Sequence, residues 1–488
     1  MFRPSKRTTM TQKGKNKRSE QFFKRMENLL GTEETQLFMN SIRQFSPKSV
    51  RYNRKQVPPE DLKGALVPWC QPYGRYWEKQ FLPSRSVEYT AGKYYIQEAS
   101  AMLAISAASQ VIDFSHKIVL DLAAAPGGKA TQAAELIDSG YLVANEVIKK
   151  RLDALTWNVN RCRLNNIIIT SLAPNILAQT LPGFFDVVVV DAPCSGEGLF
   201  SKQKHSLEKW SEKSVRFCAA RQASILRDAA VLLKPGGFLV YSTCTFAPEE
   251  NEQQVELLLS HGFIPVPLPI PGDLPVSPAI SENANIRLCS RRIFPHREGG
   301  AGAFVSVVQK QDDPLPVGQW EFHHGQLDPV IRLKGMRYPH IRTEESGGYF
   351  YEKNGIISYF SRESIPEFLL QSAYQIGAPV IDKIRAYDCM FGSVQLASPT
   401  AIIGVGEAEA EAYARGEELR LDAVDGYYYI ALQGMVLGPV KVSNGRAVNK
   451  FPKPLRVRNL FSKRFLAAGG NVTFQSVRWP VFPATLLL

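Results

Sequence analysis

Two kinds of segment alternate along residues 117–310. Short runs of Val, Ile and Leu, typical of strands buried on both faces, are separated by stretches with helical spacing, such as 130–138 and 149–163. This order of strand, helix and strand predicts an α/β fold with a right-handed parallel sheet. The expected strands are 118–122, 141–146, 167–171, 185–190 and 238–244, with 303–309 closing the sheet.

The first hundred residues have a different pattern. Residues 1–18 contain seven bases and no acid, which favours a disordered basic arm. Apolar residues recur at helical spacing between 19 and 37, and residues 47–92 are irregular and rich in Pro, Tyr and Trp. We therefore expect a small N-terminal domain of the RNA-binding type at 19–100. Its last residues, 94–100, are expected to begin the helix that leads into the sheet.

The residues after 310 are expected to form two further units. Residues 311–380 show mixed strand and turn signals without candidate chemistry, and are interpreted as an intermediate domain. In 381–488, seven acids lie within 407–425, whereas the last fifty residues contain nine bases and no acid. With its short β-prone runs, this segment predicts a β-rich module with one cationic face. Such a face is often only solvated, and RNA contact is the alternative.

Charge and cysteine content narrow the classes of function. The chain of 488 residues has a formal net charge of +12, which favours a polyanionic partner. Seven scattered cysteines without a secretory signal indicate free thiols in a reducing cytoplasm. No apolar run approaches the roughly 20 residues of a membrane helix, and no Cys-x-x-Cys pair suggests a metal site. We expect no membrane, no metal and a monomer.

Two expected strands end in residues with reactive side chains. Asp191 directly follows the run of four valines at 187–190, and Cys194 lies on the flexible loop behind it. Cys244 ends the expected strand 238–244. Parallel strands present their carboxyl ends, and their ligands, at one edge of the sheet, so both thiols are expected there. The alternative is that Cys194 is a small residue that only caps its strand.

A turn of small residues, 123–129, follows the first expected strand. Glycines allow a ligand to approach the backbone at the start of the next helix. Glu146 ends the second strand, where a carboxylate accepts hydrogen bonds from both hydroxyls of a ribose. Because no Gly-x-Gly-x-x-Gly is present, the turn suits a nucleoside without a pyrophosphate, of which S-adenosylmethionine is the common one. A plain tight turn is the alternative.

Four motifs together resemble one enzyme family. They are YIQEAS at 95–100, DLAAAPGGK at 121–129, DAPCSGEG at 191–198 and STCTFAPEENE at 242–252. Residues 20–310 thereby resemble the Sun-type RNA cytosine-C5 methyltransferases. The C-terminal extension, with NGRAVNKFPKP at 444–454, is similar to that of the bacterial ribosomal RNA small subunit methyltransferase F subfamily.

The resemblance implies a Rossmann-like, S-adenosylmethionine-dependent methyltransferase domain at 101–310 and a PUA-like RNA-binding module at 381–488. The implied substrate is a cytosine in the decoding region of 16S ribosomal RNA, within the small ribosomal subunit. By the same resemblance Cys244 is the nucleophile that attacks C6, Cys194 helps to release the product, and Asp191 contacts the base. Residues expected at the cofactor are Leu122, Ala123, Ala124, Ala125, Pro126, Gly127, Gly128, Glu146, Ala173 and Asp191.

One position departs from the family pattern. Relatives carry an acid that contacts the adenine edge where this chain has Ala173. A backbone group would have to serve instead, or the affinity for the cofactor would be lower. Two other functions stay open at this point. A transfer RNA cytosine-5 methyltransferase would carry the same catalytic motifs, and a non-catalytic ribosome-assembly factor would keep the fold without needing both cysteines.

Overall fold

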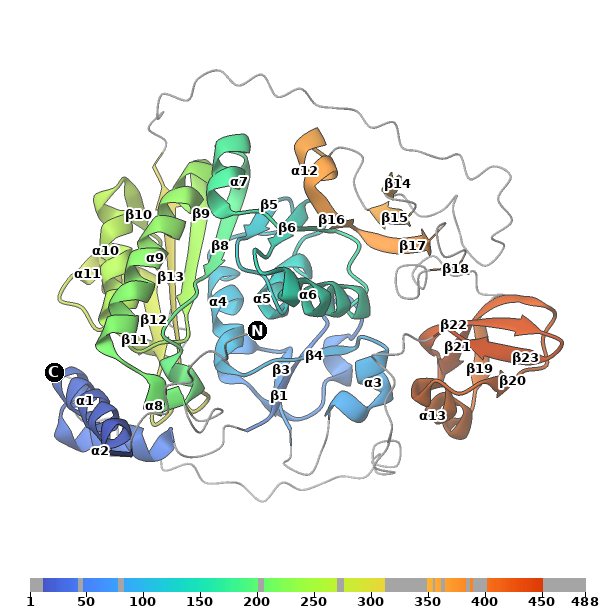
Figure 1. Ribbon diagram of the computed structural model, residues 1–488, viewed down its shortest axis with the longest axis horizontal. Coiled ribbons are helices and arrows are strands. Elements are labelled where there is room, and N and C mark those ends of the chain that lie inside the picture. Colours follow the sequence, from blue (N-terminus) through green and yellow to red (C-terminus); the bar gives the residue numbers. More distant parts are fainter. Residues whose placement is uncertain are drawn as a thin grey trace, which may run out of the picture.

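The structure is a computed structural model. It contains one large central β-sheet and three smaller β-sheets (Figure 1). The parts of the chain that it describes are 12–42, 47–77, 83–200, 206–269, 276–311, 349–353, 356–360, 365–382, 387–388 and 402–450. Most of the expected intermediate domain, the first eleven residues of the basic arm and the last 38 residues of the expected C-terminal module lie outside these ranges.

The central sheet confirms the expected α/β fold. Five neighbouring strands run parallel, in the order β9-β8-β5-β6-β7. The strand bounds are β5 Ile118–Asp121, β6 Tyr141–Asn145, β7 Ile167–Thr170, β8 Phe185–Asp191 and β9 Leu233–Thr243.

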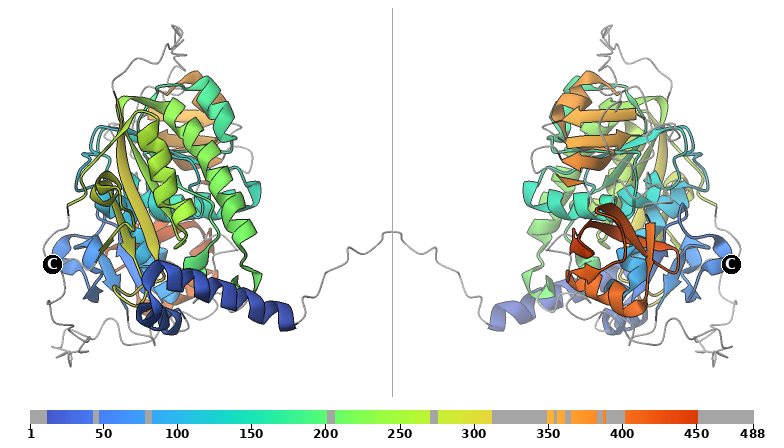
Figure 2. Two further views of the ribbon diagram at one scale, coloured as in Figure 1. Left: turned by 90° about the vertical axis from the view of Figure 1, so that its left-hand side faces the viewer. Right: turned by 90° about the vertical axis from the view of Figure 1, so that its right-hand side faces the viewer.

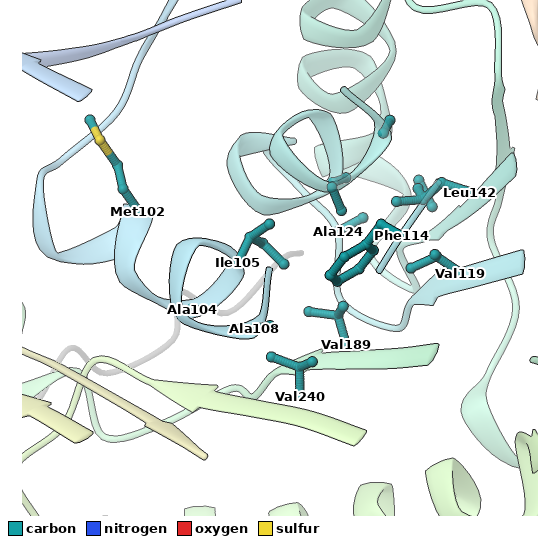
Figure 3. Packing of buried hydrophobic residues seen from close by; sticks show 14 of the residues in the cluster. Met102, Ala104, Ile105, Ala108, Phe114, Val119, Ala124, Leu142, Val189 and Val240 are labelled. Carbon is teal, nitrogen blue, oxygen red and sulfur yellow. The ribbon is translucent and has the colours of Figure 1, made fainter. Parts of the chain in front are cut away.

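Alternate residues of these strands enter two separate cores. In β8, Val187 and Val189 pack with the core under α4 (Leu103–Ala108), α5 (Gly128–Ala134) and α6 (Lys149–Arg161). Val188 and Val190 pack with the core under α7 (Pro174–Thr180), α9 (Glu212–Leu232) and α10 (Glu252–Ser260). Figure 3 shows the first core, where Val189 and Val240 face Ile105 and Ala108 of α4. The sequence of β8 contains four consecutive valines because both faces of this strand are buried.

The sheet extends beyond the expected strands at both edges. β13 (Ala303–Lys310) does not close it, because β12 (Ser290–Ile293), β11 (Ser277–Pro278) and β10 (Phe263–Pro265) follow. At the other edge β16 (Ala373–Ile376), from the expected intermediate domain, pairs antiparallel with β7. An edge strand leaves backbone groups unpaired, and these short strands satisfy them. Sequence periodicity does not show which distant segment will do so.

The N-terminal part contains two helices and a four-stranded sheet. α1 (Gln12–Leu30) begins seven residues earlier than expected, so residues 12–18 are helical and the expectation of a disordered arm is wrong for them. Lys and Arg have high helix propensity and extend the helix outward from its packed end. The sheet has the order β2 (Ala65–Leu66), β3 (Gly74–Tyr76), β1 (Ser49–Tyr52) and β4 (Tyr94–Ile96). Residues 94–96 are thus a strand, because their backbone pairs with β1, and not the start of a helix.

Helices α1 and α2 (Thr32–Ser41) pack against the loops that follow β8 and β9. Phe22 of α1 lies 5.1 Å from Phe200 and 5.2 Å from Trp210 between ring centroids. Phe38 of α2 lies 4.9 Å from Phe246, two residues after Cys244. Figure 2 shows α1 at the same end of the molecule as the start of α9. The N-terminal helices therefore support the end of the sheet that carries the expected chemistry.

The described part of the C-terminal module is a five-stranded sheet with one helix, α13 (Glu407–Arg415). It packs on the N-terminal part through Val87 and Ala91. Residues 402–450 contain seven acids and five bases, since six of the nine expected bases lie after residue 450, outside the described ranges. The cationic face stays a prediction. The strands are β19 Ile402–Val405, β20 Leu419–Arg420, β21 Gly426–Leu432, β22 Met435–Ser443 and β23 Arg446–Asn449.

Residues 349–388 contribute four strands to a separate small sheet. Its order is β14 (Tyr349–Lys353), β15 (Ile356–Phe360), β17 (Ala378–Asp382) and β18 (Tyr387–Asp388). Over the described ranges of the whole chain, every helix is too short or too polar to span a bilayer.

Candidate active site

The two cysteines singled out from the sequence meet at the carboxyl edge of the central sheet. The sulfur atoms of Cys194 and Cys244 are 3.2 Å apart, and both side chains are half-buried. The hydrogen bond to Cys244, together with burial, raises the pKa of Cys194 well above that of an ordinary thiol. Cys194 is therefore a neutral thiol at pH 7, in hydrogen-bond contact with the sulfur of Cys244.

Glu250 joins the two loops that carry these thiols. Its Oε2 accepts hydrogen bonds from the backbone N–H of Ser195 and from the side chain of Gln222, both at 2.9 Å. Its Oε1 lies 3.4 Å from the hydroxyl of Thr245. Glu250 is fully buried, and burial raises the pKa of its carboxyl group. One carboxylate thus binds the residue after Cys194 and the residue after Cys244.

The other polar residues of 249–252 each fix a different segment around the thiols. Glu249 forms an ion pair with Arg25 of α1. Asn251 receives a hydrogen bond from Thr243 at 2.6 Å and donates to the carbonyl of Thr245 at 2.9 Å, so it holds both neighbours of Cys244. Glu252 forms a buried ion pair with Arg292 of β12, at 2.5 Å. The motif therefore acts as a support for the Cys244 loop.

Close backbone packing also constrains this loop. The N–H of Gly198 donates to the carbonyl of Cys244 at 2.7 Å. A Cβ atom at position 198 would lie only 2.6 Å from the same oxygen, so only glycine fits here. Glu197, which is buried, accepts hydrogen bonds from Trp210 at 2.7 Å and from the backbone N–H of Phe246 at 2.8 Å. Gly198 and Glu197 thus both stabilise the loop that carries Cys244.

Asp191 lies beside these thiols with both carboxylate oxygens engaged. Oδ1 accepts a hydrogen bond from Ser242 at 3.0 Å, and Oδ2 forms an ion pair with Lys129 at 2.8 Å. Burial by itself lowers the pKa of Lys129, but Asp191, Asp121 and Cys244 outweigh it and hold the pKa above its ordinary value. Lys129 is thus a permanent cation at the edge of the sheet, close to Cys244.

The turn after β5 combines a left-handed glycine with a buried acid. Gly127 has a left-handed backbone, with φ of 110°, and caps the start of α5. Beneath the turn, Asp121 is 1% exposed, and burial raises its pKa to about 7. Its Oδ1 accepts the N–H of Ala123 at 3.2 Å, whereas Oδ2 has no hydrogen-bond partner among the described residues. An unpaired buried carboxylate oxygen next to a glycine turn fits a cationic or hydroxyl-bearing ligand.

In the turn 122–128, the side chains and the backbone groups face different surroundings. Leu122, Ala124 and Ala125 are buried in the two cores, so only their backbone groups face the edge of the sheet. Pro126 is exposed, and Ala123 and Gly128 are half-buried. The turn residues expected at the cofactor thus offer mainly backbone groups, because the side chains of Leu122, Ala124 and Ala125 pack in the cores.

Glu146 follows β6 and is 2% exposed. Its Oε1 accepts the N–H of Ile148 at 2.8 Å, and its Oε2 lies 2.9 Å from Arg151. Arg151 also donates to the carbonyl of Ala125, which connects the acid to the turn. Beside it, Val147 and Ile148 are 41% and 47% exposed, an apolar surface of the kind on which a flat heterocycle packs. These features fit the adenosine part of S-adenosylmethionine.

Ala173 caps the start of α7 and is exposed. Its carbonyl accepts N–H groups of the helix, from Ile176 at 3.0 Å and Leu177 at 3.2 Å. Neither its methyl group nor this carbonyl replaces the expected acid, so a cofactor contact at Ala173 stays a prediction.

Sequence reasoning missed three residues of this site. Lys129 and Glu250 lie inside the quoted motifs, and Gln222 lies in α9. The available signal for Lys129 was a cation at the end of the turn of small residues, 123–129. No sequence signal indicates that Gln222 binds the carbonyl of Pro193, at 3.1 Å, because the two are brought together only by packing of α9 on the sheet. In the described ranges, no three His, Cys, Asp or Glu residues are grouped as metal ligands are.

Three segments of the chain match models of known protein families. Residues 112–309 match the model "16S rRNA methyltransferase RsmB/F", and 19–99 match "N-terminal domain of 16S rRNA methyltransferase RsmF". Residues 400–457 match "Methyltransferase RsmF PUA domain". The ribosomal RNA small subunit methyltransferase F of Klebsiella pneumoniae is 31% identical over 84% of this chain and 90% of its own length. The chain belongs to the ribosomal RNA small subunit methyltransferase F family.

Other members of the methyltransferase F family match over shorter lengths. The protein from Vibrio parahaemolyticus is 34% identical over 63% of this chain and 64% of its own length. Among solved structures, a methyltransferase homologue from Pyrococcus horikoshii is 27% identical over 62% of this chain and all of its own, with a TM-score of 0.53. The expected Rossmann-like, S-adenosylmethionine-dependent methyltransferase fold is confirmed, together with the family that the motifs resemble.

Proposed function

We propose that this protein methylates C5 of a cytosine in 16S ribosomal RNA, in the decoding region, through a covalent bond between Cys244 and C6. The observation that carries the proposal is the pair of thiols 3.2 Å apart, beside Asp191 and Lys129 at one edge of the sheet. A single thiol would suffice for addition, and the second is useful only if the adduct must also be resolved. That requirement belongs to cytosine C5 chemistry, because C5 becomes nucleophilic only after addition at C6.

The residues support three steps: addition of a thiolate at C6, transfer of a methyl group to C5, and elimination of the thiolate. Cys244, as thiolate, adds to C6, and the electrons of the C5–C6 double bond become available at C5. Asp191 binds N3 and the exocyclic amine, and Lys129 keeps that carboxylate oriented. Glu146 and the 122–128 turn would hold S-adenosylmethionine, which would supply the methyl group to C5 and leave as S-adenosylhomocysteine. The C5 proton then leaves, and the electrons of the C6–sulfur bond return to Cys244.

Cys194 is placed to help release the product once the adduct has formed. Its pKa is raised chiefly by its hydrogen bond to Cys244, with burial and the charge of Cys244 as further causes. Adduct formation removes both the bond and the charge, because the sulfur of Cys244 is then bonded to C6. The pKa of Cys194 then falls toward the value that burial alone sets, which is still above that of an ordinary thiol, so Cys194 stays protonated. Its thiol is placed to give a proton to the sulfur of Cys244 as the C6–sulfur bond breaks, while a base other than this thiol takes the proton from C5.

Two variants test the assignment of the thiols. Cys244→Ala should abolish methylation and form no covalent RNA adduct, since no nucleophile is left. Cys194→Ala should still add to the base and transfer the methyl group, then stall as a protein–RNA adduct that migrates slowly on a denaturing gel. The opposite pattern would mean that the roles are exchanged, and an active Cys194→Ala enzyme without adduct would mean that Cys194 only caps its strand.

A second experiment separates the alternatives on substrate. Bisulfite sequencing of ribosomal and transfer RNA from a strain that lacks the protein identifies the methylated cytosine. Loss of the signal in transfer RNA alone would favour the transfer RNA enzyme, and an unchanged signal with intact RNA binding would favour the assembly factor. The family match to a PUA domain at 400–457 supports our proposal that the C-terminal module contributes affinity for the ribosomal RNA.

A further inference from the structure

The outer face of α9 exposes an aromatic ring among cations. Phe217 is 69% exposed, and of the described large apolar side chains only Val424 is more exposed. Lys213 and Arg221, one helical turn to either side, are exposed, as is the adjacent Arg216. Arg216 lies 3.7 Å from Glu212, and no acid in the described ranges forms an ion pair with Lys213 or Arg221. We call Lys213, Arg216, Phe217 and Arg221 the α9 surface.

The opposite face of the same helix holds the Cys194 loop. Gln222, adjacent to Arg221 and fully buried, donates to the carbonyl of Pro193 at 3.1 Å and to Glu250 at 2.9 Å. Because α9 connects two parallel strands, β8 and β9, it starts at the carboxyl edge of the sheet, where the thiols are. The α9 surface is thus separated from the thiol loop by about one helix diameter, roughly 10–12 Å.

The chemistry of the α9 surface selects its partner. A membrane-binding helix needs an apolar stripe, but this face continues with Ala220 and Ser224 and has one large apolar side chain in its N-terminal half. A protein interface core is depleted of charge, whereas three cations surround this ring. Cations spaced around one aromatic ring match a single-stranded nucleic acid, which presents phosphates and an unpaired base together.

We propose that the α9 surface binds the ribosomal RNA strand next to the target cytosine, with Lys213, Arg216 and Arg221 on phosphates and Phe217 stacked on an unpaired base. The inference rests on the proposed function, since it takes the same RNA as substrate. It adds a location for the flanking strand. An RNA bound on this face lies over the helix that positions the Cys194 loop, so a cytosine turned out of the strand has a short path to the thiols.

Filter binding of the full-length protein to an unmodified 16S ribosomal RNA transcript, at several salt concentrations, tests the proposal. Phe217→Ala should weaken binding about tenfold without changing the salt dependence, and Phe217→Tyr should restore it. The double variant Lys213→Ala, Arg221→Ala should flatten the slope of log K against log salt by about 0.7 for each phosphate that is no longer neutralised. Arg227→Ala, on the same helix but toward its other end, is the matched control and should bind like the wild type.

Two results would overturn the proposal. The first is wild-type affinity and salt slope in all variants, with folding verified by binding of S-adenosylmethionine in calorimetry. The second is unchanged RNA binding together with abolished binding to vesicles of anionic phospholipid or to small-subunit proteins, which would assign another partner. Binding is measured without methylation, so a failure of the proposed function, seen as no 5-methylcytosine from the wild type, is distinguishable from either result.

Discussion

Removal of the Glu250 carboxylate should disable both thiol loops at once. In Glu250→Ala, the N–H of Ser195 and one N–H of Gln222 lose their acceptor inside a buried region. Each buried donor left without a partner costs about 1–3 kcal/mol, so the free energy of unfolding should fall by about 2–6 kcal/mol. The cost of burying the carboxylate, which raises its pKa, disappears with it and offsets part of this decrease.

The effect on activity should exceed what instability explains. A displacement of about 1 Å at a reacting group costs around a hundredfold in rate, and Glu250 is bonded to residues adjacent to both Cys194 and Cys244. Glu250→Gln is the matched control. Its amide oxygen can accept from Ser195 and Gln222 in place of Oε2, and its NH₂ group can donate to Thr245, so stability should change by about 1 kcal/mol or less.

Urea unfolding and single-turnover methylation of the 16S transcript measure the two consequences. We expect Glu250→Ala to be destabilised and, at a temperature where it is fully folded, to transfer the methyl group at least about a hundredfold more slowly. Binding of S-adenosylmethionine should be unchanged, because the bonds of Glu250 go to the thiol loops and α9. A folded Glu250→Ala enzyme with wild-type turnover would refute the reasoning, and equal decreases in Glu250→Gln would show that charge matters, not the hydrogen bonds.

Two further predictions concern the cofactor side of the site. Glu146→Ala should bind S-adenosylmethionine about tenfold or more weakly in calorimetry, since each charge-assisted hydrogen bond that is removed costs about 1.5–3 kcal/mol, and unchanged affinity would remove Glu146 from the site. Asp121, with its pKa raised to about 7, binds more protons in the folded than in the unfolded chain between about pH 4 and 7, so without cofactor stability should fall as pH rises through this window. Asp121→Asn should abolish that fall and be on the order of 2–4 kcal/mol more stable than wild type at pH 8 in urea unfolding, while a persisting fall would place its origin elsewhere.

The sequence by itself determined the parallel sheet and the position of its chemistry. Four consecutive valines before Asp191 specify a strand buried on both faces, because polar residues at alternate positions would enter a core. Parallel strands end at one edge, so two cysteines at the ends of two such strands are neighbours, and they lie 3.2 Å apart. These inferences succeed because they depend on local periodicity and on the direction of the strands.

Tertiary structure alone decided which distant residues meet. The pairing of β16 with β7, the hydrogen bond from Gln222 to Pro193, and the packing of Phe38 on Phe246 join segments between 29 and 208 positions apart. Periodicity identifies the buried face of a helix or strand but not its partner. The protonation of Cys194 has the same origin. Its raised pKa comes from a hydrogen bond and from burial, neither of which exists until both loops are fixed around Glu250.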